Sequence, residues 1–215
     1  MPQNADALLA LLTRAPVIPV IVLDDLRAAR PVAEALVAGG LPILEVTLRT
    51  ARAFDIVAAM SEVEGAIVGA GTVLTREQAR RAVDIGCRFL VSPGAPLHLL
   101  DIAGDLPIPL LPGVATPTEA MTAAERGFRI LKYFPAEAMG GTAVLKALAS
   151  PFPDLRFCPT GGIDREKAKE YLALPNVICV GGSWVLPPDA IRARDYERIE
   201  TLARDAAALK AGRTE

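Results

Sequence analysis

The sequence predicts a (β/α)8 TIM barrel with an extra N-terminal helix, and two observations lead to this prediction. Eight short apolar runs alternate with helical segments along the 215 residues, which is the pattern of consecutive βα units. The ends of these runs carry glycines and polar side chains, as the ligand-binding end of a barrel does. A doubly wound open sheet is the alternative that the same alternation allows. No linker, low-complexity tract or charge block divides the chain, so residues 1–215 are expected to form one domain.

The predicted strands are runs of apolar, often branched residues bounded by glycine, proline or charged positions. They cover Val17–Leu23, Ile43–Leu48, Ala66–Ala70, Phe89–Ser92, Ile108–Leu111, Arg129–Phe134, Leu155–Pro159 and Val177–Val180. The predicted helices are rich in Ala, Leu, Glu and Arg. They cover Ala5–Thr13, Asp25–Ala38, Ala51–Ser61, Arg76–Ile85, Pro117–Arg126, Ala143–Ala149, Arg165–Ala173 and Tyr196–Leu209. Thr75 followed by Gln78 predicts a capping box, and Asp164 is placed to cap the helix after it.

Composition argues against several classes of function. The formal net charge of −2 offers no basic surface for nucleic acid or for an anionic membrane. The start of the chain lacks the basic segment and apolar core of a signal peptide, and its apolar runs are far shorter than a membrane span, so we expect a cytoplasmic protein. The three cysteines lack metal or redox spacing and are expected to be small buried residues. A mean hydropathy of +0.34 fits a sheet buried on both faces, together with a subunit interface.

Lys132 is the most informative residue, because it lies inside the apolar run Arg129–Phe134. An ammonium held away from water loses its hydration, and burial therefore favours the neutral amine. A neutral amine is a nucleophile that condenses with a ketone or aldehyde to form a Schiff base. A lysine that reaches from a strand end into solvent is the alternative. The residues around other strand ends favour the chemical interpretation.

Polar side chains also alternate along the run Ile43–Leu48 and just beyond it. Period-two alternation places Glu45, Thr47 and Arg49 on one face of this strand. Barrel interiors are normally filled with branched apolar residues, so a glutamate and an arginine there indicate a functional site, with a structural ion pair as the alternative. A desolvated carboxyl group can move protons near neutrality, and an arginine is suited to binding a substrate carboxylate.

Two glycine pairs follow the last two predicted strands. Gly161-Gly162 and Gly181-Gly182 each precede a short helical segment, which is typical of a barrel phosphate site built from backbone N–H groups. Two flexible turns are the alternative. A third glycine-rich strand end, Gly69-Ala70-Gly71-Thr72, gives backbone access to a ligand with the Thr72 hydroxyl as a donor, or is simply a tight turn.

These motifs together resemble one known family over nearly the whole chain, from about Val17 to Leu209. The matching segments are Glu45-Val-Thr-Leu-Arg49-Thr, Gly69-Ala-Gly-Thr72, Ser92-Pro93-Gly94, Leu131-Lys132-Tyr-Phe134-Pro-Ala-Glu137, Cys158-Pro-Thr160-Gly161-Gly162 and Gly181-Gly182-Ser183-Trp184. They are similar to those of the bacterial 2-keto-3-deoxy-6-phosphogluconate (KDPG) aldolases, many of which also act as 4-hydroxy-2-oxoglutarate aldolases.

The resemblance implies a class I aldolase on a (β/α)8 barrel that needs no metal or other cofactor and assembles as a homotrimer. By motif, Lys132 forms the imine and Glu45 is the acid and base. Arg49 and Thr72 then hold the pyruvate carboxylate, Pro93 and Phe134 line the pocket, and Thr160, Gly161, Gly162 and Ser183 complete the substrate and phosphate side.

The resemblance also implies a reaction, the cleavage of 2-dehydro-3-deoxy-6-phosphogluconate to pyruvate and D-glyceraldehyde 3-phosphate. Cleavage of 4-hydroxy-2-oxoglutarate to pyruvate and glyoxylate, or of the C4 epimer 2-dehydro-3-deoxy-6-phosphogalactonate, remains open. A sugar-phosphate isomerase or epimerase, with Lys132 as an electrostatic contact, is an alternative from another class. A non-catalytic ligand-binding barrel would leave Glu45, Arg49 and Lys132 without an explanation.

Overall fold

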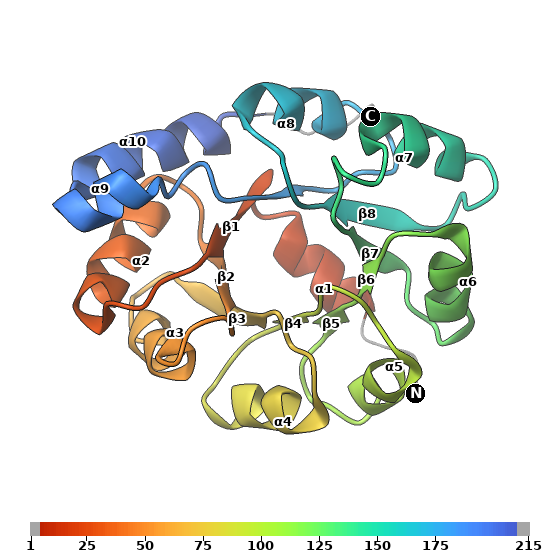
Figure 1. The fold of residues 1–215 in the computed structure, drawn as a ribbon, viewed down its shortest axis with the longest axis horizontal. Helices are drawn as coiled ribbons and strands as arrows, with labels where there is room; N and C mark the ends of the chain where they lie inside the picture. The colour runs from red at the N-terminus through yellow and green to blue at the C-terminus, as the bar shows by residue number, and fades with distance from the viewer. Residues whose placement is uncertain (1–4, 210–215) are drawn as a thin grey trace.

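The computed structural model describes residues 5–209, in which parallel strands form a curled central layer with helices packed around it (Figure 1). The strands are β1 (Val17–Ile21), β2 (Ile43–Thr47), β3 (Ile67–Gly71), β4 (Leu90–Val91), β5 (Leu110–Leu111), β6 (Gly113–Val114), β7 (Ile130–Tyr133), β8 (Arg156–Pro159) and β9 (Val180–Gly182). Each lies within or next to a predicted apolar run, because burial on both faces requires near-continuous apolar sequence.

The prediction of a closed eight-stranded (β/α)8 barrel is wrong. The larger sheet is an open, curled, six-stranded parallel sheet in the order β5-β4-β3-β2-β1-β9, and β6, β7 and β8 form a separate three-stranded sheet. Pro112 explains one interruption, because it has no backbone N–H to give to a strand ladder and it lies between β5 and β6. Between β8 and β9, the described residues form isolated bridges instead of a continuous ladder. The strand order also lacks the reversal that defines a doubly wound sheet.

The helices follow the strands in alternation, as predicted. They are α1 (Ala5–Leu12), α2 (Ala29–Ala38), α3 (Ala53–Ser61), α4 (Arg76–Asp84), α5 (Leu97–Ala103), α6 (Pro117–Glu125), α7 (Gly141–Ala149), α8 (Arg165–Leu172), α9 (Pro188–Ala193) and α10 (Tyr196–Ala207), with a 3-10 turn at Leu26–Ala28. The Thr75–Gln78 capping box is confirmed, and Asp164 caps α8 by accepting a hydrogen bond from the Lys167 N–H at 2.9 Å. The short helix α5 was not predicted, whereas α9 agrees with the short helical segment expected after Gly181-Gly182. No helix within residues 5–209 is long and apolar enough to span a bilayer.

Helix α1 takes a different place from the others, at the centre of the view between the two curled sheets (Figure 1). Its Leu8 and Leu12 are buried in an inner cluster with the strand residues Ile43 and Ile130. These two residues lie at the first positions of β2 and β7, so α1 covers the amino ends of the strands. The carboxyl ends are left for a site, which is where βα architectures place their ligands.

Small residues on β3 make room for large side chains on the inner face of the curled sheet. A side chain at Gly69 would collide with the ring of Phe89, which is fully buried. A side chain at Gly71 would collide with the carboxylate of Glu45. Glycine at these two positions therefore lets the side chains of Phe89 and Glu45 pack directly against the backbone of β3. The glycines have this steric role in addition to any role in the turn that follows.

Candidate active site

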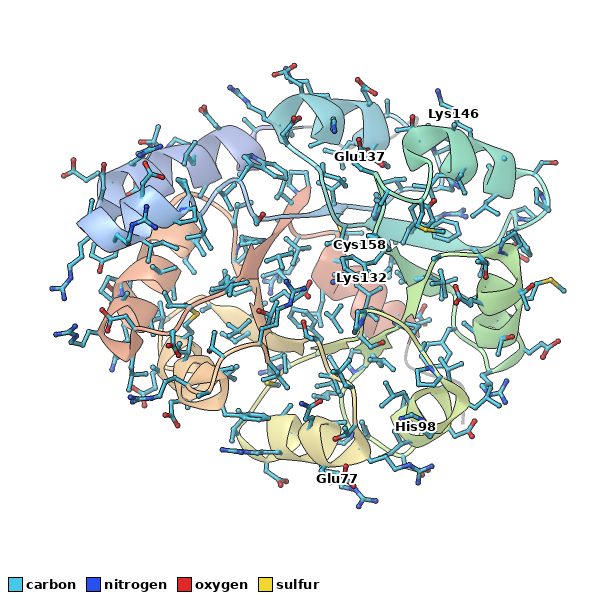
Figure 2. The ribbon with its side chains drawn as sticks, viewed as in Figure 1. Glu77, His98, Lys132, Glu137, Lys146 and Cys158 are labelled. Atoms are coloured by element: carbon cyan, nitrogen blue, oxygen red, sulfur yellow. The ribbon has the colours of Figure 1, made fainter. Side chains whose placement is uncertain are left out.

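Lys132 and Glu45 meet between the two sheets, from β7 of the smaller sheet and β2 of the larger one. Nζ of Lys132 lies 3.0 Å from Oε1 and 3.4 Å from Oε2 of Glu45. Each side chain is only 3% exposed. Figure 2 shows Lys132 near the centre of the molecule, beside its strand neighbour Cys158. An amine and a carboxylate in contact within a low-dielectric interior can exchange a proton over a short distance.

The sequence positions both side chains through strand geometry. Both strands are buried along their whole length, so their side chains meet packed neighbours on both faces of the sheet. Thr47, on the same face of β2 as Glu45, donates to the carbonyl oxygen of Ile21 at 2.9 Å, which ties β2 to β1 above the pair. Tyr133 points away from the pair, and its hydroxyl donates to the carbonyl oxygen of Met139 at 2.6 Å.

Arg49 lies beyond the end of β2 and is exposed, whereas the alternation predicted it to face the interior with Glu45. Its Nε donates to Oγ1 of Thr72 at 3.1 Å. Thr72 has a φ of 57°, a conformation that costs a β-branched residue about 1–3 kcal/mol and that occurs at ligand sites. The two residues that were predicted to hold a carboxylate are therefore in contact.

A cavity of about 160 Å³ opens beside this arrangement at the carboxyl ends of the strands. It is lined by Val20, Val22, Arg49, Phe134, Thr160, Gly161, Gly162, Ile163, Gly181 and Ser183. Nζ of Lys132 lies 5.4 Å from the centre of the Phe134 ring, which connects the buried pair to the cavity wall. Thr72 joins the cavity through Arg49. Pro93 and Gly182 are not among the lining residues, and the backbone of Pro93 packs against Gly113.

Three lining residues were missed in the sequence: Val20, Val22 and Ile163. Val20 and Val22 are two positions apart, and period-two alternation at the end of the first strand could have identified them as one face. Val22 is 49% exposed, which is unusual for a valine next to a buried strand. Ile163 carried no such signal, because it follows the glycine pair in a loop.

The two glycine pairs have different roles in the structure. Gly161 and Gly162 form a turn with φ angles of 107° and 76°, which only glycine adopts readily. Gly181 and Gly182 lie in β9 and not in a loop. Glycine is needed at both positions because side chains there would collide with Thr160 and Trp184. Within residues 5–209, the N–H groups of Gly162 and Ser183 donate no hydrogen bond to the protein. Both residues line the cavity, so these donors are available to an anion.

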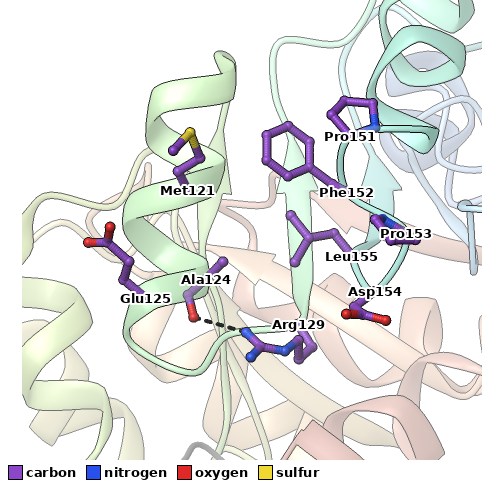
Figure 3. Close-up of a pocket in the computed structure, with 9 residues that line it drawn as sticks. All are labelled: Met121, Ala124, Glu125, Arg129, Pro151, Phe152, Pro153, Asp154 and Leu155. Atoms are coloured by element: carbon purple, nitrogen blue, oxygen red, sulfur yellow. Dashed lines mark hydrogen bonds between the residues drawn. The ribbon is translucent and has the colours of Figure 1, made fainter.

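A larger cavity of about 380 Å³ lies elsewhere, between α6 and the segment that leads into β8 (Figure 3). Met121, Phe152 and Leu155 provide much of its apolar wall. Its arginine, Arg129, donates to the carbonyl oxygen of Ala124 at 2.9 Å. No buried acid–base pair lines it, so the smaller cavity is the one with reactive groups beside it.

The three cysteines are free and buried, as predicted. Burial raises the pKa of Cys87 to about 12. The pKa of Cys179 is raised by its hydrogen bond with Cys158 and then by burial. Protonated thiols are poor nucleophiles and poor metal ligands. In the part of the chain that the structure describes, no group of three or more His, Cys, Asp or Glu side chains is arranged to hold a metal ion.

Known proteins share this sequence and this fold. The model of the KDPG and KHG aldolases matches residues 8–202. The KHG/KDPG aldolase of Escherichia coli K12 is 50% identical over 198 residues, which are 92% of this chain and 93% of that protein. The KDPG aldolase of Zymomonas mobilis ZM4, crystallised with 3-phosphoglycerate, superposes with a TM-score of 0.92 at 45% identity, covering 98% and 99% of the two chains.

A second crystal structure is informative about chemistry. It is the KDPG aldolase of Legionella pneumophila, with pyruvate captured at low pH as a covalent carbinolamine intermediate. It superposes with a TM-score of 0.91 at 44% identity, covering 93% of this chain and 98% of that one. The chain is therefore an aldolase, a carbon–carbon lyase, and it belongs to the KDPG and KHG aldolase family.

Proposed function

We propose that this aldolase cleaves 2-dehydro-3-deoxy-6-phosphogluconate to pyruvate and D-glyceraldehyde 3-phosphate through a Schiff base on Lys132. The observation that carries the proposal is the 3.0 Å contact between the buried Nζ of Lys132 and Oε1 of Glu45. The names of the relatives from E. coli and Z. mobilis support the substrate. The carbinolamine captured in the L. pneumophila relative supports covalent catalysis by an amine.

The first step forms the imine. Glu45 accepts a proton from Lys132, and the neutral amine attacks the C2 carbonyl carbon of the substrate. The resulting carbinolamine loses its hydroxyl group as water and becomes an iminium ion. Glu45 is placed to supply the proton that this water carries away, because it contacts the same nitrogen.

The second step breaks the C3–C4 bond. Glu45 takes the proton of the C4 hydroxyl group, the C4 oxygen becomes the aldehyde of glyceraldehyde 3-phosphate, and the bonding electrons move into the iminium to give an enamine. Glu45 then returns a proton to C3, and water hydrolyses the new iminium to release pyruvate and free Lys132. One carboxyl group serves as base and acid in turn, so its position against the amine matters at every stage.

The two ends of the substrate are bound by different groups. Arg49 and Thr72 hold the carboxylate, since the guanidinium is exposed beside the cavity and is oriented by the Thr72 hydroxyl. The N–H groups of the Gly161–Gly162 turn and of Ser183 hold the phosphate. Phe134 and Thr160 form the cavity wall between these two ends. Pro93 supports this wall, and Gly181 and Gly182 leave space for the side chains of Thr160 and Trp184.

The assay for this function compares three substrates. Pyruvate release from 2-dehydro-3-deoxy-6-phosphogluconate, from its C4 epimer and from 4-hydroxy-2-oxoglutarate is followed with lactate dehydrogenase and NADH. We expect 2-dehydro-3-deoxy-6-phosphogluconate to have the highest kcat/KM. The rates should be unchanged after treatment with EDTA, because the proposed mechanism uses no metal. A higher kcat/KM for either other substrate would replace the proposed one.

We also propose that residues 1–215 fold as one domain, which assembles as a homotrimer in the cytoplasm. The described residues share a continuous set of packed elements, and residues 1–4 and 210–215 lie outside them. Light scattering on the eluting peak of a sizing column would give three times the 22.7 kDa mass of one chain. The isomerase and the binding-protein alternatives lose support, because the named relatives are aldolases.

A further inference from the structure

One side chain connects the loop after Lys132 to the helix that follows the Gly161–Gly162 turn. Glu137 lies in the loop between β7 and α7 (Figure 2). Its Oε1 accepts a hydrogen bond from the hydroxyl of Tyr171 at 2.6 Å, and its Oε2 lies 2.7 Å from Nζ of Lys167. Both partners belong to α8 (Arg165–Leu172), so the carboxylate links the loop after β7 to the helix that follows the glycine turn.

The same residue also contacts the glycine turn directly. The backbone N–H of Glu137 donates to the carbonyl oxygen of Gly161 at 3.1 Å. A side chain at Gly162 would lie 2.9 Å from Cβ and Cγ of Glu137, so the stem of the glutamate packs closely against that glycine. Nζ of Lys167 reaches the carbonyl oxygen of Gly162 at 3.4 Å. The turn is thus held through both of its carbonyl groups, which leaves the Gly162 N–H for the cavity.

Charge and burial keep Glu137 ionised and Tyr171 protonated, which are the states that their hydrogen bond requires. Hydrogen bonds from Lys167 and then from Tyr171 lower the pKa of Glu137, so the carboxylate is ionised at neutral pH. Tyr171 is fully buried, and burial followed by the hydrogen bond to Glu137 raises the pKa of its phenol, which remains a donor. None of Glu137, Lys167 and Tyr171 is among the residues that line the cavity.

We propose that Glu137 is a positioning residue that, with Tyr171 and Lys167, holds the Gly161–Gly162 turn in the shape that receives the phosphate end of the substrate. The inference rests on the proposed function, because it assumes that this turn binds the phosphate. Glu137 does not touch the substrate. It therefore controls the affinity for a phosphorylated substrate and leaves imine formation at Lys132 largely unaffected.

The test compares a phosphorylated ligand with one that has no phosphate. KM for 2-dehydro-3-deoxy-6-phosphogluconate is measured together with the pyruvate concentration that gives half-maximal borohydride trapping. We expect Tyr171→Phe to raise KM about tenfold, the effect of losing one hydrogen bond to a charged group. Glu137→Ala also loses the contact with Lys167 and should raise KM at least as much. The pyruvate concentration for half-maximal trapping and the kcat for cleavage should change much less. Glu137→Gln should recover part of the affinity, because its amide oxygen can still accept from Tyr171.

Glu166→Gln is the matched control. Glu166 lies on the same helix, forms an exposed ion pair with Lys169 at 2.7 Å and does not contact the turn. This variant also removes one negative charge and should keep the wild-type KM.

A wild-type KM in Glu137→Ala and Tyr171→Phe would overturn the inference. So would an equal rise in KM and in the pyruvate concentration for half-maximal trapping. If Glu137→Ala does not fold, Tyr171→Phe, which loses only a hydroxyl group, decides the question. Failure of the proposed function would instead appear as a wild-type enzyme that does not cleave the phosphorylated substrate.

Discussion

The amine of Lys132 and the carboxylate of Glu45 lie 3.0 Å apart, although 87 residues separate them in the chain. Both side chains are almost completely removed from water. Such a pair is a poor source of stability, because the cost of desolvating two charges is comparable to their attraction. Its presence inside two buried strands, near a cavity, is better explained by chemistry that needs a nucleophile and a proton carrier in contact.

Lys132→Ala should abolish aldol cleavage, because no other amine contacts Glu45 within the described residues. The measurement is kcat for pyruvate release, with a matched control at Lys146, an exposed lysine on α7 (Figure 2). Lys146→Ala should keep the wild-type rate. Activity within a few-fold of wild type in Lys132→Ala would rule out the imine mechanism.

Glu45→Gln should separate imine formation from turnover. The amide cannot carry protons, so kcat should fall by about 10²–10⁴-fold, the usual contribution of general acid–base catalysis. Borohydride trapping with pyruvate should still modify the protein, because Lys132 is retained. Loss of trapping along with turnover would mean that the proton transfers of Glu45 during imine formation are indispensable and that water does not replace them, contrary to this expectation.

Gly71→Ala tests the space that β3 leaves for Glu45. The added methyl group would collide with the Glu45 carboxylate, which must move away from Lys132. A displacement of about 1 Å can reduce a catalytic rate about 10²-fold, so we expect a large fall in kcat with both catalytic residues intact. Gly86→Ala is the control. Gly86 has a φ of 89°, so the substitution strains the backbone, but no other atom lies within 4 Å of the added methyl group. The position is also far from the catalytic residues in the chain. Gly86→Ala should lower the thermal midpoint and leave kcat unchanged, and the reverse pattern would contradict the steric argument.

The buried pair also predicts a non-additive effect on stability. Removing one partner leaves an uncompensated charge, so Lys132→Met and Glu45→Leu should each lower the free energy of unfolding by about 3–5 kcal/mol. The double variant should lose less than either single variant, because two apolar side chains of similar volume replace the pair. Urea unfolding at 25 °C measures all three. A double variant whose loss equals the sum of the single losses would show that the two residues do not interact.

The cysteines predict a pH dependence of labelling. The pKa of Cys87 is raised to about 12 by burial, and that of Cys179 is raised by Cys158 and by burial. A raised pKa means less thiolate at a given pH, so at pH 8 the folded protein should react with Ellman's reagent far more slowly than a free cysteine. All three thiols should react at once in 6 M guanidinium chloride. Rapid labelling of Cys87 in the native protein would contradict the burial described here.

Particular elements show how much of the fold the sequence could predict. The runs around β1, β2, β3 and β7 were found because uninterrupted apolar stretches identify buried strands. Closure of the sheet was predicted wrongly, because it depends on hydrogen bonds between strands that are distant in sequence, such as β8 and β9. The short strand β6 was also missed: the predicted run Ile108–Leu111 ended before Pro112, and the chain resumes strand structure just beyond this proline in the other sheet.

The candidate site divides in the same way. Lys132 and Glu45 could be found because a charged side chain in an apolar strand is costly and therefore conspicuous. Gly181 and Gly182 were chosen as part of a phosphate site after a strand, but they lie within β9, where side chains would collide with Thr160 and Trp184. Their part in phosphate binding stays a prediction. The exposed position of Arg49 depends on β2 ending at Thr47, and strand ends are poorly determined by sequence pattern.

Borohydride trapping with pyruvate, followed by peptide mass mapping, tests the central claim most directly. The protein is incubated with pyruvate, reduced and digested, and the modified residue is identified. The account predicts one reduced pyruvate adduct, on the amine of Lys132. No adduct in correctly folded protein, or an adduct on a different lysine, would contradict it.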